Sequence, residues 1–318
     1  MSALESPPEV DRSPTASMPI LVTSLEDVGP RPRRVAVGNF DGVHPGHAAV
    51  IGGCDTALTF APHPLAVLAP ERVPARLTDL AAKAELAGAL GVRELVVLPF
   101  NRGLAQQSAE SFVQDVLVGA LCAVHVSVGI NFRYGSGATG DARTLAESSS
   151  FTTSAAQLVE VAGDVVCSSR IRAAIARGDL PLAARLLGRP HRMPCRLEPH
   201  DSLQTLPSGR QAAHFTVSAG HACPPPGWYA SRLRRADTRR PAVETTIYVS
   251  AECGDERHHG LLVVPEIGFA APLAGRVVVE VLRGVRAAAL QVDAAATCGG
   301  AHEPSRFPMR QHEACRNG

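Results

Sequence analysis

The chain has 318 residues, of which 45% are apolar, and its formal net charge is +1. This length suits about two domains with a sizeable core, and the charge gives no general attraction for nucleic acid or for a membrane surface. No apolar run approaches the roughly 18 residues of a membrane-spanning helix. Residues 1–20 have no basic start followed by an apolar block, so we expect a cytoplasmic protein without a secretory signal.

Two residue types restrict the chemistry. The eight cysteines lie far apart and form no CxxC pair, which disfavours a zinc ribbon or a thioredoxin-type site and predicts reduced thiols. Lys83 is the only lysine among the 31 basic residues. A P-loop needs Gly-Lys-Ser/Thr and is therefore excluded. Phosphate binding must therefore rely on Arg, His, backbone N–H groups and metal.

The first part of the chain alternates between two patterns. Residues 1–20 are rich in Pro and Ser and are predicted to be disordered. We expect strands at 33–37, 56–60, 92–100, 123–130 and 157–166, and helices at 77–91, 108–121, 168–178 and 179–188. Thr78, Ser108 and Asp179 are the expected N-caps. This alternation predicts an α/β domain over residues 21–188, with a Rossmann-like parallel sheet and right-handed crossovers.

After Gly188 the helical periodicity disappears. Short β-type runs separated by Gly and Pro occur at 210–220, 227–235, 244–252, 260–268 and 275–285. They predict a small antiparallel β-barrel over residues 189–288, followed by a disordered tail at 289–318. His258 and His259 lie near Cys253 in the sequence and could suggest a metal site. However, the side chains of adjacent histidines point in different directions, and no fourth ligand has a suitable spacing for zinc. We therefore expect a solvated turn.

The string "GNFDGVHPGH" at residues 38–47 begins where the first expected strand ends. Ligands gather at such strand ends in open parallel sheets. Its glycines permit close backbone approach, and His44 and His47 stand at the start of the helix that follows. Two imidazoles beside free helical N–H groups can hold polyphosphate oxygens without any lysine.

This string resembles the GxFDxxHxGH motif of the HxGH nucleotidylyltransferase superfamily. That superfamily ends its core with an ISSTxxR-like motif, and "CSSRIR" at residues 167–172 occupies that place. The resemblance implies attack of a substrate phosphate on the α-phosphate of a nucleotide, with pyrophosphate leaving. Ser168 and Ser169 can donate to phosphate, and Arg170 and Arg172 can neutralise its charge. Cys167 stands where the family usually has its first Ser.

Further segments resemble bacterial FAD synthetase, the adenylyltransferase half of bifunctional riboflavin kinase/FAD synthetase. They include "TFAPHP" (59–64), "VLPFN" (97–101), "VGINFRYGSGATGD" (128–141) and "AAIARGDLPLAARLLGRPHR" (173–192). The resemblance implies that ATP and FMN give FAD and pyrophosphate, with Mg²⁺ accompanying ATP. It also implies the following roles: His44, His47, Asn131 and Arg172 in catalysis; Gly38, Phe40, Asp41, Gly46, Ser168 and Ser169 in ATP binding; His63, Pro64, Asn131, Phe132 and Arg133 in flavin binding; and no protein-bound metal.

The second half departs from that family. "GRPHRM" (188–193), "PPGWYASRL" (225–233) and "AGRVVVEVLRGVR" (274–286) resemble parts of the riboflavin kinase barrel. The kinase's Pro-Thr-Ala-Asn motif and its Gly-rich phosphate loop are not found. Glu244 and Glu252 are the nearest candidates for a catalytic base, but neither has family context. We therefore predict a degenerate barrel without riboflavin kinase activity.

The connection after His47 is also short. Only "AAVIGGCD" separates it from the strand at 56–60, whereas a parallel crossover needs at least about 10–12 residues. We expect a turn or two of helix, stopped by Gly52 and Gly53, where the family usually has several turns. Two alternatives stay open: a degenerate paralogue that binds flavin or nucleotide without turnover, and a nucleotidylyltransferase for another phosphorylated metabolite.

Overall fold

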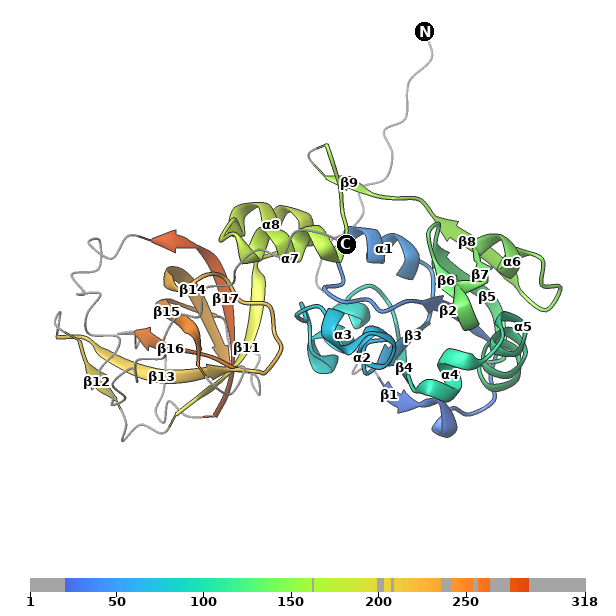
Figure 1. Ribbon diagram of the computed structural model, residues 1–318, viewed down its shortest axis with the longest axis horizontal. Coiled ribbons are helices and arrows are strands. Elements are labelled where there is room, and N and C mark those ends of the chain that lie inside the picture. The colour runs from blue at the N-terminus through green and yellow to red at the C-terminus, as the bar shows by residue number, and fades with distance from the viewer. Residues whose placement is uncertain are drawn as a thin grey trace, which may run out of the picture.

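The structure is a computed structural model in which residues 21–161, 163–198, 203–206, 209–235, 242–253, 257–263 and 275–285 are described. Figure 1 shows a sheet with helices on its two faces and a separate barrel, with two helices between them. The predicted disordered segments at 1–20 and 289–318 lie outside the described residues. The predicted architecture, a Rossmann-like parallel sheet followed by a small antiparallel barrel, is confirmed.

The first part is built on a six-stranded sheet with the strand order β1-β4-β3-β2-β5-β8. Every pair of neighbours in it is parallel. The strands are β1 (Leu21–Ser24), β2 (Arg33–Val37), β3 (Thr56–Ala61), β4 (Glu94–Pro99), β5 (Ala123–Gly129) and β8 (Thr152–Ala156). Successive side chains of a strand point to opposite faces. Accordingly, Val35 and Val37 of β2 belong to one core cluster and Ala36 to another.

Short helices cover both faces of this sheet (Figure 1). The α-helices are α1 (Pro45–Ile51), α2 (Leu65–Leu68), α3 (Leu80–Gly88), α4 (Arg102–Gln106), α5 (Ala109–Ser111) and α6 (Ala142–Ala146). A π-helix, η3 (Phe112–Ala120), continues α5, and 3-10 turns occur at η1 (Leu25–Asp27), η2 (Pro70–Arg72) and η4 (Ser136–Ala138). The hairpin of β6 (Arg133–Tyr134) and β7 (Gly140–Asp141) lies within the loop after β5.

Two of the three expected N-caps are confirmed, and the helix expected at 77–91 is shorter, Leu80–Gly88. Ser108 and Asp179 are N-caps, accepting hydrogen bonds from the backbone N–H groups of Ser111 and Leu182. The cap of α3 is Asp79 and not Thr78, because the Thr78 hydroxyl is held elsewhere, as described below. Helix α1 has seven residues and ends at Gly52, so the predicted short helix after His47 is confirmed.

The strand expected at 157–166 is wrong. The sheet edge is β8, whose sequence TTSAA is small and polar, so it lacks the apolar run by which a strand is recognised. Within this range β9 (Glu160–Val161) and β10 (Asp164–Val165) pair instead as two short antiparallel strands. Gly163 has a positive φ of 78°, a conformation that suits a tight turn and ends an extended strand.

Two helices connect the sheet to the barrel: α7 (Ser168–Ala176) and α8 (Leu180–Leu187). The barrel strands are β11 (His191–Leu197), β13 (Gln211–Val217), β14 (Gly227–Arg235), β15 (Val243–Cys253), β16 (Arg257–Val263) and β17 (Gly275–Val285). Pairing of β11 with both β17 and β13 closes the barrel, and β12 (Gln204–Thr205) pairs with β13 outside the ring. Leu233, Ile247, Val249 and Val279 are fully buried in its core.

The solvated turn expected at His258 and His259 is also wrong, because both residues lie within strand β16. His259 Nδ1 lies 3.3 Å from the Thr216 hydroxyl. In the described part of the chain no three His, Cys, Asp or Glu side chains are grouped so as to hold a metal ion. Among the described side chains, the thiols of Cys54, Cys122, Cys167 and Cys195 form no disulfide. None of the described helices is long and apolar enough to cross a membrane.

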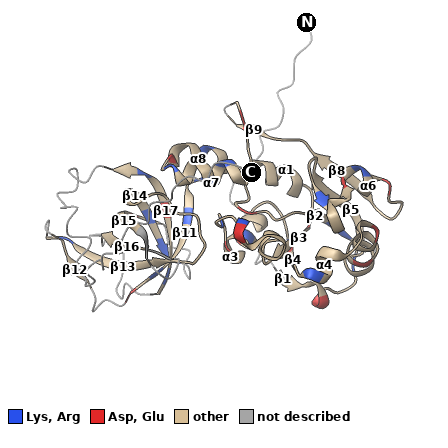
Figure 2. Cartoon of the chain, in the orientation of Figure 1, with Lys and Arg blue, Asp and Glu red and all other residues tan. Residues whose placement is uncertain are grey.

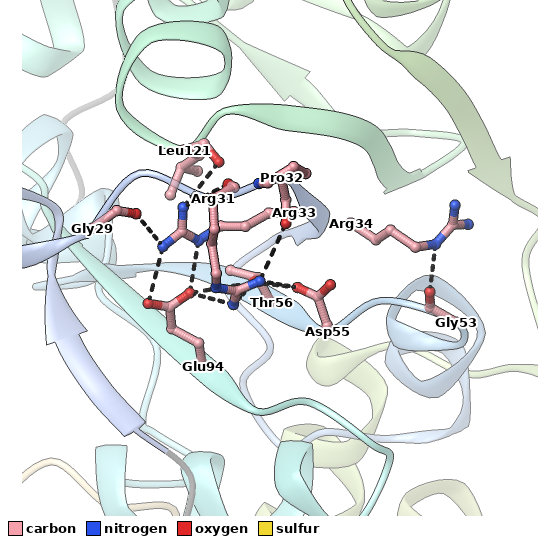
Figure 3. A network of polar contacts seen from close by, with 10 residues as sticks. All are labelled: Gly29, Arg31, Pro32, Arg33, Arg34, Gly53, Asp55, Thr56, Glu94 and Leu121. Carbon is pink, nitrogen blue, oxygen red and sulfur yellow. Dashed lines mark hydrogen bonds and ion pairs between the residues drawn. The ribbon is translucent and has the colours of Figure 1, made fainter.

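Charged side chains occur on both parts of the molecule (Figure 2). One group of charged side chains lies where β2, β3 and β4 begin (Figure 3). The "GNFDGVHPGH" segment follows the other end of β2. In this charged group the Glu94 carboxylate accepts hydrogen bonds from Arg33 Nε and Arg31 Nη2, both at 2.7 Å. Arg33 is 1% exposed, and a charge so fully buried requires a partner. We therefore interpret this network as structural.

Candidate functional site

A cavity of about 750 Å³ lies at the C-terminal ends of the central strands, where ligands of open parallel sheets gather. Every residue to which the resemblance assigns a role in catalysis or binding lines it except Ser169; Arg170, offered as a charge partner for phosphate, does not line it either. These lining residues are Gly38, Phe40, Asp41, His44, Gly46, His47, His63, Pro64, Asn131, Phe132, Arg133, Ser168 and Arg172. The fold therefore brings together residues from four separate segments of the sequence.

The loop at residues 38–44, here called the motif loop, has an unusual backbone. Phe40, Gly42 and Val43 have positive φ values of 47°, 92° and 38°. For a non-glycine residue such a conformation costs on the order of 1–3 kcal/mol and persists only where the surroundings impose it. Glycine is favoured at position 42 by its φ, and an added Cβ would also lie 2.9 Å from Leu77 Cδ1, so that side chain would have to move.

Asp41 anchors this loop. Its carboxylate accepts hydrogen bonds from the backbone N–H groups of Leu77 and Thr78, at 2.9 and 3.0 Å, and from the Thr78 hydroxyl. It also forms an ion pair with Arg172 Nη2 at 2.6 Å. The Thr78 hydroxyl in turn accepts a hydrogen bond from Gly42 N, which explains why it does not cap α3. Since both carboxylate oxygens have protein partners, the geometry favours positioning over direct nucleotide contact for Asp41.

His44 and His47 form a stacked pair at the start of α1. Their ring centroids are 3.7 Å apart and their planes differ by 17°. His44 Nδ1 accepts a hydrogen bond from the backbone N–H of His47, so in the neutral ring the proton is on Nε2. Burial, and then the charge of Arg189, lowers the pKa of His44 to about 4. In His44, Nδ1 therefore caps the helix by accepting a hydrogen bond, and Nε2–H remains as a hydrogen-bond donor.

His47 is in a similar state. Burial, and then its neighbour His44, lowers the pKa of His47 well below 6.5. Its Nδ1 is buried and has no hydrogen-bond partner among the described residues. A buried polar atom without a partner is costly. His47 lines the cavity, and the negative charge of a phosphate bound there would favour the protonated ring.

Lys83 is a contributor that sequence reasoning missed. Its Nζ donates hydrogen bonds to Asn39 O at 2.7 Å and to the Thr59 hydroxyl at 2.9 Å. It is buried, and burial lowers its pKa to about 8. Lys83 does not line the cavity, so it supports the motif loop from behind. The available signal was a lone lysine among the apolar residues of a helix.

The start of α7 forms the other polar wall. Cys167 is the N-cap without a side-chain hydrogen bond, and the Ser168 hydroxyl donates to Asp41 O at 2.8 Å. Arg172 donates through Nε to Ala75 O at 2.7 Å in addition to its ion pair with Asp41. Arg170 instead pairs with Asp164 and, like Ser169, is not among the lining residues. The structure thus brings Ser168 and Arg172 to the cavity and leaves their neighbours outside.

Several other lining residues of the cavity are aromatic, and we call them the aromatic wall. Phe132 and Tyr134 stack at 5.7 Å, and Phe60 meets Phe100 edge to face at 6.1 Å. Apart from Phe132, these aromatic residues were not predicted; the signal was an aromatic residue at the end of β3 and just after β4. Asn131, Phe132 and Arg133 continue from β5 along this wall, and His63 and Pro64 follow β3. Such a wall suits a flat ring system of low polarity.

Two of the predicted residues on this wall have local partners. Arg133 pairs with Asp141 across the β6–β7 hairpin at 3.4 Å and is largely exposed. His63 Nδ1 accepts a hydrogen bond from Leu65 N at 3.2 Å, and burial, and then the charge of Arg172, lowers the pKa of His63. His63 is therefore a neutral ring whose Nε2 carries the proton.

Comparisons with known proteins agree with this geometry. The family model described as FAD synthetase matches residues 28–170. Bifunctional riboflavin kinase/FMN adenylyltransferases are similar over longer stretches. The protein from Pseudomonas fluorescens is 39% identical over 192 residues, which cover 56% of this chain and 61% of that protein. The Escherichia coli (strain K12) protein is 31% identical, and the match covers 58% of this chain and 64% of that protein. The Listeria monocytogenes protein is 35% identical, and the match covers 63% of this chain and 67% of that protein.

A solved structure extends the likeness to the barrel. The crystal structure of a protein described as a macrolide-efflux protein from Streptococcus pneumoniae matches with a TM-score of 0.73 and covers 84% of this chain and 91% of that one. At 21% identity this likeness shows the fold alone. The chain spans 61 to 64% of the length of the first two curated relatives. On the sequence matches, the chain belongs to the bacterial FAD synthetase family.

Proposed function

We propose that this protein is an FMN adenylyltransferase, which transfers AMP from ATP to FMN and releases pyrophosphate. The observation that carries the proposal is one cavity with two kinds of lining residue. A neutral, stacked pair of histidines and the start of α7 line it together with several aromatic side chains. Asn131 lines the same cavity. These two kinds of lining suit the phosphates of ATP and the ring of a flavin.

The reaction is a substitution at phosphorus. An oxygen of the FMN phosphate attacks the α-phosphorus of ATP, and the bond from that phosphorus to the oxygen bridging to the β-phosphate breaks. That oxygen leaves with pyrophosphate. The protein's task is to align the two phosphates and to stabilise the charge that develops on their oxygens. His44, through Nε2–H, and His47 are the proposed donors to those oxygens.

Other residues receive proposed roles from their position. Ser168 and the backbone N–H groups at the start of α7 would hold the β- and γ-phosphates, and Ser169 lies one residue beyond that wall. Arg172 contributes positive charge while it holds Asp41. Asn131 would contact the reacting phosphate. The remaining proposed contacts are Gly38, Phe40 and Gly46 on the adenosine side, where Asp41 positions the loop, and His63, Pro64, Phe132 and Arg133 on the flavin side.

Magnesium is expected to arrive bound to the phosphates of ATP. Asp41 is the only carboxylate among the described residues that line the cavity, and both of its oxygens have protein partners. Mg²⁺ prefers carboxylate and phosphate oxygens. Since the donor set offers it no carboxylate that is free of protein partners, the side chains do not form a dedicated metal site, and we derive no step through the ion.

We further propose that residues 21–188 form the transfer domain and that residues 189–288 form a barrel without riboflavin kinase activity. The missing Pro-Thr-Ala-Asn motif supports the second proposal. Glu244 is exposed on β15, and the side chain of Glu252 lies outside the described residues. Incubation of the protein with riboflavin, ATP and Mg²⁺ tests the proposal. Formation of FMN would overturn it. The expected cytoplasmic location stays a prediction.

The transfer activity is tested with FMN, ATP and Mg²⁺, following FAD and pyrophosphate together. We expect both products in equal amounts and their loss in His47→Ala. Tight FMN binding without product would favour the paralogue that only binds, an outcome for which the seven-residue α1 would supply a reason. Pyrophosphate release with another phosphate ester, but not with FMN, would favour a different nucleotidylyltransferase.

A further inference from the structure

The motif loop is held in place by contacts from outside itself. It combines positive φ values at Phe40, Gly42 and Val43, so its shape depends on its partners. Two of its carbonyl groups share one partner, the guanidinium of Arg189. Nη1 donates to Val43 O at 3.1 Å, and Nη2 donates to Gly42 O. These carbonyls directly precede His44, so Arg189 constrains the position of the first catalytic imidazole.

Arg189 belongs to the short segment between α8 and β11 and not to the sheet. Its Nη1 also donates to Leu187 O at 3.2 Å, which fixes the guanidinium relative to the end of α8. Burial, and then the charge of Arg192, lowers the pKa of Arg189 to about 10, so it keeps its charge at neutral pH. A planar fork that donates to two adjacent carbonyls is a geometry that lysine cannot reproduce.

The barrel fixes this segment in turn. His191, two residues after Arg189, donates through Nε2 to Ala222 O at 2.8 Å. The same barrel loop pairs with the backbone of Arg76, because Arg76 N donates to Gly220 O and Ala222 N donates to Arg76 O, both at 2.8 Å. Arg76 immediately precedes the two residues whose N–H groups hold Asp41. The barrel is therefore linked to the motif loop in two ways: through the segment that carries Arg189 and through the backbone of Arg76.

We propose that Arg189 is a positioning residue for adenylyl transfer and that, through it, the docked barrel sets the geometry of the groups that hold the reacting phosphates. This inference rests on the proposed FMN adenylyltransferase function. It gives a barrel without kinase activity a role in the remaining reaction. It also predicts that disturbing the domain junction slows the chemical step more than it weakens flavin binding, since Arg189 contacts the loop that bears His44 and lies apart from the aromatic wall.

The test uses the full-length protein and the variants Arg189→Ala and Arg189→Lys. Arg185→Ala is the matched control, because Arg185 is an exposed residue of α8 four positions away. We expect kcat for FAD formation to fall roughly 30-fold in Arg189→Ala, since small misalignments of reacting groups are costly, with the KM for FMN nearly unchanged. Millimolar guanidinium should restore part of the rate, and Arg189→Lys should be intermediate.

Hydrogen exchange supplies a readout that does not depend on turnover. Amides of residues 42–48 should exchange faster in Arg189→Ala and not in Arg185→Ala. Unchanged kcat and unchanged exchange in Arg189→Ala would overturn the inference. If that variant does not fold, a wild-type kcat and wild-type exchange in Arg189→Lys would overturn it. If the wild type makes no FAD but the loop still loosens in Arg189→Ala, the proposed reaction fails while the clamp on the loop stands.

Discussion

The sheet domain and the barrel each contain a pair of stacked histidines, and the two pairs differ in the partners of their ring nitrogens. In the barrel the His191 and His221 rings lie 5.5 Å apart, and each donates through Nε2 to a backbone carbonyl, of Ala222 and Arg192 respectively. In the sheet His44 uses Nδ1 for its own helix, and His47 Nδ1 has no partner among the described residues.

The hydrogen-bond partners of the ring nitrogens distinguish structural histidines from ligand-binding histidines more clearly than burial does. Burial lowers the pKa of all four imidazoles, so a lowered pKa does not distinguish the pairs. A ring whose hydrogen bond is already made to the backbone fixes the fold. A ring with an unused nitrogen beside a cavity has interaction energy left for a ligand. The sheet pair meets the second description and the barrel pair meets the first.

His47→Ala is the most direct way to break this comparison. Loss of a donor to the developing phosphate charge should lower kcat/KM for FAD formation roughly 10²- to 10³-fold. His125→Ala is the matched control, because the ring nitrogens of His125 already lie near the hydroxyls of Thr152 and Ser154. That variant should keep kcat/KM within about twofold. Equal losses in both variants would mean that His47, too, is structural.

Glu94→Gln extends the comparison to a buried carboxylate that accepts its hydrogen bonds from Arg31 and Arg33 within the protein. Removing the negative partner of the buried Arg33 should lower the free energy of unfolding by about 3 kcal/mol, measured in urea, with kcat for FAD formation unchanged. Glu71→Gln, at an exposed position, is the control and should change neither quantity. A large loss of kcat in folded Glu94→Gln would show that satisfied groups at this end of the sheet also govern transfer.

The pH dependence of that stability has a defined sign. Burial alone would raise the pKa of Glu94, but the hydrogen bond and charge of Arg33, together with Arg31, outweigh it and lower the pKa below 4.5. The contribution is therefore fully present above about pH 4.5 and is lost as the pH falls through the lowered value. Glu94→Gln should lack this part of the acid sensitivity.

Asp41→Asn tests a residue that shares features of structural and of ligand-binding groups. Its carboxylate oxygens have hydrogen-bond partners within the protein, but the residue lines the cavity. An amide there would direct an N–H₂ group toward Arg172 or toward the N–H groups of Leu77 and Thr78. We expect a loss of about 2 kcal/mol in unfolding and a roughly tenfold fall in kcat. Asp27→Asn, at an exposed position, is the control. A loss of stability with full activity would remove Asp41 from the positioning network.

The sequence predicted much of this arrangement where its signals were local. Gly52 and Gly53 stop α1, and the motif loop and Ser168 reach the cavity as expected. The strand expected at 157–166 was wrong because the true edge strand, β8, has small polar residues. The aromatic wall was largely missed because its members come from several segments and meet only in the folded chain. The partners of Asp41 and Lys83 likewise depend on tertiary contacts that no local pattern indicates.

His221→Gln has the smallest expected effect and tests the barrel pair itself. Burial lowers the pKa of His221 from 6.5 to about 4, so between these values the unfolded chain binds more protons and stability falls as the pH falls. Gln keeps an N–H donor for Arg192 O but does not titrate. In urea unfolding the variant should match the wild type within about 1 kcal/mol at pH 8 and gain about 2 kcal/mol relative to it by pH 5.

His221→Phe completes this test, because it also removes the titration but leaves Arg192 O without its donor. It should show the same flattened pH dependence from a lower starting stability, by about 1 kcal/mol. If either variant instead follows the wild-type curve from pH 8 to pH 5, His221 is not held neutral by burial. The barrel pair would then not be the structural counterpart of the pair in the cavity, and an unused nitrogen would no longer distinguish them.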